Sequence, residues 1–186
     1  MDSVYRFGHD TTMHSDGKLL EMLTGYAAAH QHPFNIFVHM IGIPTIMLGA
    51  LIPLSWISIA NGPIEITLAH AVVIGFFLFY LTLDQLFALV FLLFALLIAA
   101  LAAKIGAMPM KISATVAAIA FFGGYLAQFI GHAVEKSMPV LIKHPIQANL
   151  AAPFFTVVEL FKLAGLREDL FDTVQERIRD QQDSAV

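Results

Sequence analysis

Residues 86–103 read LFALVFLLFALLIAALAA, an unbroken run of eighteen apolar residues. A charge-free run of this length is typical of a helix that crosses the roughly 30 Å hydrocarbon core of a bilayer. The composition of the whole chain also indicates a membrane protein, because 58% of its 186 residues are hydrophobic, 13% are charged and the mean hydropathy is +0.76. Since a soluble domain has about 25% charged residues, the sequence predicts an integral membrane protein.

Three further apolar stretches, at 36–60, 64–83 and 112–130, are long enough to span a membrane. The first contains Pro44 and Pro53, which predict a kinked or broken helix. We therefore expect an all-α integral membrane protein with about four transmembrane helices, flanked by amphipathic or interfacial helices.

Polarity divides the chain into three predicted parts: a polar tail at 1–14, a helical membrane domain at 15–165 and a charged helix at 166–186. The membrane domain should begin with an amphipathic helix at 15–30, capped by Ser15. Its apolar face would consist of Leu19, Leu20, Leu23 and Tyr26. The segment 151–165 is apolar but too short to span, which predicts an interfacial or re-entrant helix.

Lys and Arg residues predict the orientation. Four spans would place both termini on one side, together with eight of the ten positive residues. Because positive loops stay cytoplasmic, we expect both termini in the cytoplasm, although Lys104 and Lys111 lie on the other side in this scheme. Residues 1–30 contain no basic-then-apolar leader, so the first span should act as its own insertion signal.

Composition also excludes several kinds of site. The chain has no cysteine, which excludes disulfides, thiolate nucleophiles and iron–sulfur clusters. The net charge is −4 and no Lys/Arg stripe is present, so nucleic acid is not an expected partner. Any metal must be held by nitrogen and oxygen atoms, for which the chain offers eight histidines.

Two polar clusters flank the membrane spans. YAAAHQHPFNIFVH at 26–39 precedes and begins the first span, and HAVE at 132–135 follows the fourth. Four spans would bring both clusters to the same leaflet. Polar groups beside lipid are costly and usually functional, so we expect a site between the helices at this level.

Spacing decides which side chains could meet there. Asn35 and His39 share one helix face at i, i+4, and His132 and Glu135 share another at i, i+3. His30 lies nine residues before His39, about half a turn out of phase on a straight helix.

These two histidines converge only if the chain breaks between them, and Pro33 supplies that break. His30, His39, His132 and Glu135 would then form a set of nitrogen and oxygen donors suited to Fe(II), Zn or Mn. Glu135 could be a ligand or an acceptor that fixes a histidine tautomer.

The structural alternative is that each histidine is an ordinary polar residue at the membrane interface. We expect His70 to form a hydrogen bond across helices and His9 and His14 to be solvated, whereas His32 and His144 lie in loops. Separately, close helix packing should be permitted by three glycines, Gly123, Gly124 and Gly131.

The pattern Y-x₃-H-x₂-P-x-N-x₃-H at 26–39, together with QFIGH-x₂-EK-x₂-P at 128–139, resembles the small membrane 2-hydroxy fatty acid dioxygenases. The resemblance covers about 20–165 and includes APFF at 152–155. It implies a catalytic membrane domain that uses Fe(II) and O₂ to shorten 2-hydroxy fatty acids by one carbon. The membrane would be a bacterial inner membrane or the endoplasmic reticulum.

The same resemblance implies that His30, His39 and His132 are the iron ligands and that Glu135 and Asn35 assist catalysis. A 2-hydroxy acid can chelate a metal through its carboxylate and hydroxyl groups, with its tail among the helices in contact with membrane lipid. From position alone, Lys136 or Lys143 could meet the carboxylate. Tyr26, the first residue of the motif at 26–39, is expected to bind substrate together with these lysines.

Three other functions stay open. A di-iron hydroxylase would group its histidines in H-x₃-H and H-x₂-H-H boxes, which this chain lacks. A haem electron carrier could use His39 and His132 as its two axial ligands. A non-catalytic scaffold or small transporter is the third, although the spans contain few charges to support transport.

Overall fold

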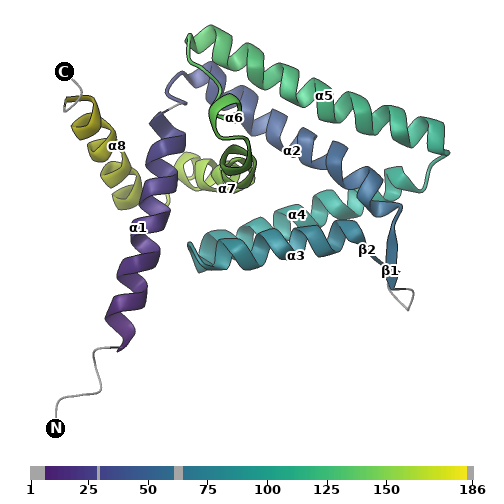
Figure 1. The fold of residues 1–186 in the computed structure, drawn as a ribbon, viewed down its shortest axis with the longest axis horizontal. Coiled ribbons are helices and arrows are strands. Elements are labelled where there is room, and N and C mark those ends of the chain that lie inside the picture. Colours follow the sequence, from purple (N-terminus) through teal and green to yellow (C-terminus); the bar gives the residue numbers. More distant parts are fainter. Residues whose placement is uncertain (1–6, 29, 61–64, 184–186) are drawn as a thin grey trace.

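The computed structural model describes residues 7–28, 30–60 and 65–183, which form eight helices and one two-stranded sheet (Figure 1). The elements are α1 (Phe7–Ala28), α2 (Pro33–Ser55), β1 (Ser58–Ala60), β2 (Ile66–Thr67), α3 (Leu68–Leu81), α4 (Gln85–Gly106), α5 (Met110–Glu135), α6 (Val140–Lys143), α7 (Pro145–Leu163) and α8 (Glu168–Asp183).

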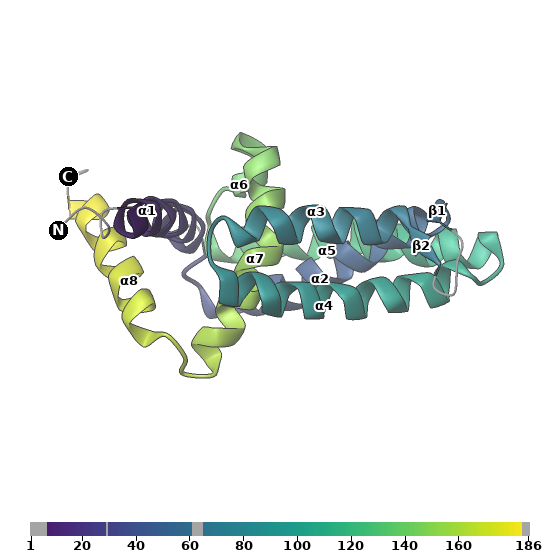
Figure 2. The ribbon, with the colours of Figure 1, turned by 90° about the horizontal axis from the view of Figure 1, so that it is seen from below.

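Three described helices, α2, α4 and α5, are long and apolar enough to cross a membrane. The helices α7 and α8, bent by 115°, would add a fourth span if the pair is counted as one. Figures 1 and 2 show α2 to α5 lying along the long axis of the molecule, whereas α7 runs crosswise at one end. The all-α membrane fold predicted from the sequence is therefore confirmed.

The first two predicted spans differ in detail from the structure. The sequence predicts a kinked or broken helix, and α2 continues through Pro44 and Pro53, so the broken alternative is wrong, because membrane helices tolerate proline. The second span begins only at Leu68 and has 14 residues, because the two residues before it form β2 and pair with β1. Residues 61–64 lie outside the described ranges.

His70 caps its own helix instead of bonding across helices as predicted. Its Nδ1 accepts a hydrogen bond from the backbone N–H of Thr67, 3.1 Å away, and lies 3.0 Å from the Thr67 hydroxyl. The contact satisfies a backbone donor at the start of α3. His70 is thereby removed from the candidate metal ligands.

Two helices, α1 and α8, cover the end of the bundle where α7 lies (Figure 2). α1 begins at Phe7, so the predicted cap at Ser15 is wrong. Of the predicted apolar face, Leu19, Leu23 and Tyr26 are buried, and Leu20 is only partly buried. The charged helix predicted after residue 166 is α8, whose Val174 and Ile178 are buried in the main core, with Leu170 and Phe171 partly buried against it.

The segment predicted as an interfacial or re-entrant helix forms most of α7. It starts earlier, at Pro145, and its Phe154, Val157 and Val158 are almost completely buried in the main core. α7 contacts α1, α2 and α4. It therefore joins the terminal helices to the membrane bundle and closes the end of the bundle.

α2 and α5 form the most extensive helix pair, and glycines allow their backbones to approach closely. A Cβ on Gly49 would lie 2.5 Å from the backbone N of Phe121, and one on Gly124 would lie 2.6 Å from Ile46 Cγ1. Gly131 is equally close to Asn35, so two of the three predicted glycines have this role. Gly123 does not, because nothing lies within 4 Å of its Cβ position.

We expect Gly49→Ala to destabilise the protein by about 1–3 kcal/mol, because the new methyl group meets rigid backbone. Gly123→Ala is the matched control and should be neutral, or stabilise the helix slightly. Thermal unfolding of both variants in the same detergent would test this. Equal transition temperatures would contradict the importance of the close approach.

Candidate metal centre

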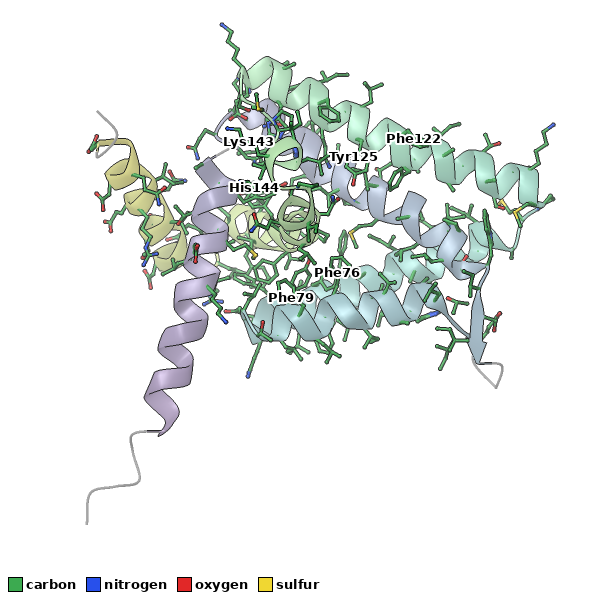
Figure 3. All side chains as sticks on the ribbon, in the orientation of Figure 1. Phe76, Phe79, Phe122, Tyr125, Lys143 and His144 are labelled. Carbon is green, nitrogen blue, oxygen red and sulfur yellow. The ribbon has the colours of Figure 1, made fainter. Side chains whose placement is uncertain are left out.

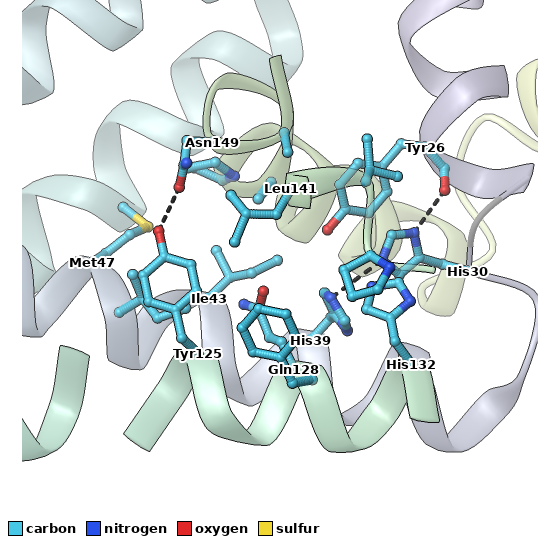
Figure 4. A pocket seen from close by; sticks show the side chains of 17 residues that line it. Tyr26, His30, His39, Ile43, Met47, Tyr125, Gln128, His132, Leu141 and Asn149 are labelled. Carbon is cyan, nitrogen blue, oxygen red and sulfur yellow. Dashed lines mark hydrogen bonds between the residues drawn. The ribbon is translucent and has the colours of Figure 1, made fainter. Parts of the chain in front are cut away.

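Three histidine side chains, from segments far apart in the sequence, meet near the end of the bundle. One ring nitrogen from each of His30, His39 and His132 lies within 4.8 Å of the others. All three residues are buried, with exposed fractions of 2–3%. Figure 4 shows the three rings side by side at one end of a pocket. The convergence predicted from spacing and topology is therefore present.

Each histidine reaches this point through the local course of its backbone. The chain leaves α1 before His30 and starts α2 at Pro33, where His32 is the N-cap residue and its Nδ1 accepts from the N–H of Phe34. His39 lies in the second turn of α2, and His132 lies in the last turn of α5. The first turns of α2 and the last turns of α5 lie side by side (Figure 1).

The hydrogen bonds of His30 and His39 fix both tautomers. Nδ1 of His30 donates to the carbonyl oxygen of Tyr26 at 2.7 Å, and Nδ1 of His39 donates to that of Asn35 at 2.9 Å. Carbonyl oxygens can only accept, so each Nε2 carries a lone pair. The two Nε2 atoms face each other 3.2 Å apart. Neither can donate to the other, which leaves the pair repulsive without a cation between them.

This distance fits a shared metal ion. Two imidazole nitrogens bound at about 2.0–2.1 Å, at tetrahedral or octahedral angles, lie roughly 3.0–3.4 Å apart. Burial, with His39 as the next contributor, lowers the pKa of His30 to about 3, so this imidazole is neutral and its lone pair is available.

Ser137 orients the third histidine. Its oxygen lies 2.9 Å from Nδ1 of His132, and its hydroxyl donates to Glu135 Oε2 at 3.1 Å. Nδ1 of His132 also lies 3.4 Å from Nδ2 of Asn35, which can only donate. The serine contact is the shorter one, and because the single hydroxyl hydrogen of Ser137 points to the carboxylate, we assign the Nδ1–H of His132 to the serine oxygen. Nε2 of His132 is then a third free lone pair. The sequence analysis missed Ser137, because a serine five residues after a histidine has no characteristic spacing.

Glu135 holds the connector before α2. Its Oε1 accepts the backbone N–H groups of Gln31 at 2.6 Å and His32 at 2.7 Å, and its Oε2 accepts the side-chain amide of Asn35. A carboxylate with these partners is occupied as an acceptor. Glu135 is not in the group of converging ligand atoms, and the hydrogen bonds described for it reach no imidazole directly, so neither of the two roles expected for it is seen.

Asn35 is fully buried against Gly131. A Cβ on Gly131 would lie 2.4 Å from Asn35 Oδ1, and this oxygen has no hydrogen-bond partner among the described residues. Neither Asn35 nor Glu135 lines the pocket beside the histidines. The geometry therefore gives both residues a positioning role.

The pocket at the histidines is small, about 60 Å³, and partly open to the surroundings. The ring of Tyr26 stacks on His30 with 4.1 Å between centroids and 6° between planes. Figure 4 shows the Tyr26 hydroxyl and the Gln128 amide pointing into the pocket. Nothing in the sequence singles out Gln128 within its motif, but the structure places it in the lining of this pocket.

The remaining candidates lie away from the pocket lining. Lys136, which has a left-handed backbone (φ 58°), and Lys143 are exposed, and neither lines the pocket. Figure 3 shows Lys143 and His144 together where α6 meets α7. His32 and His144 are exposed as well, and the side chains of His9 and His14 lie outside the described part.

Comparison with known proteins agrees with this arrangement. Residues 17–163 match the family described as Mpo1-like, 2-hydroxy-palmitic acid dioxygenase Mpo1-like. This chain belongs to that family. The matched region contains all three histidines and excludes α8.

A curated relative of the family is the 2-hydroxy-palmitic acid dioxygenase MPO1 of Saccharomyces cerevisiae. It is 31% identical to this chain over 149 residues, which cover 78% of this chain and 81% of the relative. No solved structure matches the chain significantly.

If the three imidazoles form a metal centre, the purified protein should bind one transition-metal ion per chain. His39→Ala and His132→Ala should abolish the binding, whereas His70→Ala, whose histidine caps α3, should leave it intact. Metal content by mass spectrometry after equilibration with Fe(II) under argon would test this. Retention of metal by both ligand variants would contradict the assignment.

Ser137→Ala should weaken metal binding about 10- to 100-fold, because His132 loses the acceptor that fixes its tautomer. Ser113→Ala is a matched control, since the Ser113 hydroxyl donates only to Met110 in its own helix. Competition with a chelator would measure both affinities. Equal affinities would show that Ser137 does not orient the ligand.

Proposed function

We propose that this protein is an Fe(II)-dependent dioxygenase that oxidatively decarboxylates 2-hydroxy fatty acids to fatty acids one carbon shorter. The single observation that carries the proposal is the set of three buried imidazoles whose ring nitrogens converge within 4.8 Å inside an apolar bundle. Membership of the family and the name of the yeast relative support the same reaction.

The proposed reaction is R–CH(OH)–COOH + O₂ → R–COOH + CO₂ + H₂O. The equation balances in atoms and electrons, so no external reductant is required. A ferrous ion held by His30, His39 and His132 would supply a Lewis acid for the 2-hydroxy acid and a reductant for O₂.

The pocket residues would bind and orient the polar head of the substrate. Tyr26 and Gln128 offer a hydroxyl and an amide to its carboxylate or hydroxyl group. Lys136 and Lys143, exposed near the site, would attract the carboxylate at longer range. Glu135 and Asn35, expected to assist catalysis, would do so by holding the connector that carries His30.

We further propose that residues 15–165 are the catalytic domain, in agreement with the family match at 17–163. α1 and α8 would face the cytoplasm, at a bacterial inner membrane or the endoplasmic reticulum. This orientation would place the histidines near the cytoplasmic leaflet, where a 2-hydroxy acid could keep its charged head at the interface.

The arrangement does not favour a haem between His39 and His132. Their ring centroids are 5.0 Å apart, and the ring of His30 lies 4.4 Å and 4.8 Å from the two. A third imidazole thus occupies the space that a porphyrin would need. A scaffold or transporter gives no reason for three buried imidazoles to converge.

Purified protein given Fe(II), O₂ and 2-hydroxypalmitate should produce pentadecanoate and CO₂, followed by mass spectrometry. His39→Ala and His132→Ala should lower the rate by more than about 100-fold. Removing a group that only hydrogen-bonds to a metal ligand typically lowers activity about 10- to 100-fold, and removing a ligand itself should lower it further. His70→Ala should remain active. Full activity in both ligand variants would refute the site, and a Soret band in the purified protein would favour the haem alternative.

A further inference from the structure

A second cavity of about 180 Å³, partly open to the surroundings, lies between α2, α3, α4, α5 and α7. Figure 3 shows Phe76 of α3 and Tyr125 of α5 on opposite sides of this space. The walls away from the histidines are formed by Leu51, Leu54, Val73, Phe76 and Phe91.

The second cavity adjoins the pocket at the histidines. The two share five lining residues, Ile46, Met47, Tyr125, Asn149 and Pro153. The Tyr125 hydroxyl donates to Asn149 Oδ1 at 2.6 Å, and Asn149 Nδ2 donates to the carbonyl of Pro145 at 2.8 Å. This pair joins α5 to α7 at the junction between the two spaces (Figure 4).

Chemical character changes from one space to the other. The first pocket contains the three imidazoles, the Tyr26 hydroxyl and the Gln128 amide. Apart from Tyr125 and Asn149 at the junction, every residue that lines the second cavity is apolar. The joined spaces thus match a molecule with a polar, metal-chelating head and a long hydrocarbon tail.

We propose that the acyl tail of the substrate passes the Tyr125–Asn149 junction and lies in the second cavity, whose far wall sets the chain length accepted. The proposal rests on the proposed function and adds the residues that determine specificity. Lipid is as apolar as a protein interior, so the tail gains little free energy by leaving the bilayer. The space available is therefore what distinguishes one chain length from another.

Photolabelling tests the location without requiring turnover. A 2-hydroxy fatty acid with a diazirine at its tail end would be bound to the full chain in lipid nanodiscs and crosslinked. The labels should fall on peptides containing Leu54, Phe76 or Phe91 and should disappear with excess 2-hydroxypalmitate. Labels confined to lipid-facing positions, and insensitive to competitor, would overturn the proposal.

Substitution tests the control of chain length. Ala50 lines the second cavity, so Ala50→Phe should lower kcat/KM for the 16-carbon substrate at least tenfold relative to an 8-carbon one. Ala118→Phe adds the same volume at an exposed position on α5 outside both cavities and should leave the profile unchanged. Phe76→Ala, which enlarges the far end, should shift the preference to longer acids.

The outcomes separate the two proposals. An active wild type whose chain-length profile is the same in Ala50→Phe and Ala118→Phe would overturn the tail site and leave the dioxygenase intact. A wild type without turnover, but with competed labels in the second cavity, would refute the reaction and support the lipid site. Metal content equal to that of the wild type would confirm that Ala50→Phe is folded.

Discussion

The close packing of α2 against α5 is the constraint on which the rest of the structure depends. Gly49 and Gly124 leave no room for a side chain at the contact, so the two backbones lie nearly in van der Waals contact. This proximity brings the second turn of α2 beside the last turn of α5. The close glycine contacts restrict sliding of α2 along α5, and this keeps His39 and His132 next to each other.

His30 has no such helix to position it and depends on a carboxylate instead. Glu135, three residues after His132, binds the backbone N–H groups of Gln31 and His32. The connector is therefore fastened to the same turn of α5 that carries a proposed ligand. Asn35 completes the link by donating to Glu135 from the first turn of α2. One anionic group thus fixes three segments.

Much of this site could be predicted from the sequence, because it depends on one proline and on the lengths of the apolar spans. Pro33 has to interrupt the helix between His30 and His39. An even number of membrane spans has to bring the polar clusters at 26–39 and 132–135 to the same leaflet, which predicts that the three histidines meet. The start of α3 could not be predicted in the same way. The apolar run continues before Leu68, but pairing with β1 and the cap between Thr67 and His70 override it.

The directions in which side chains point could also not be predicted from the spacing of residues in the sequence. Gln128 and Ser137 are ordinary polar residues in the sequence and acquire a role only when their rotamers are known. The second cavity is harder still, because Leu54, Val73 and Phe76 resemble any lipid-facing or core residue. Only the space left between five helices distinguishes them.

The order of the three imidazoles along the chain has a consequence for biosynthesis. Residues 30 and 39 leave the ribosome early, whereas residue 132 follows only after α3, α4 and most of α5 have been made. A nascent chain interrupted before that point offers two imidazoles at most from this set. If the three imidazoles hold an ion as proposed, the full set of ligands would exist only after most of the membrane bundle has been synthesised.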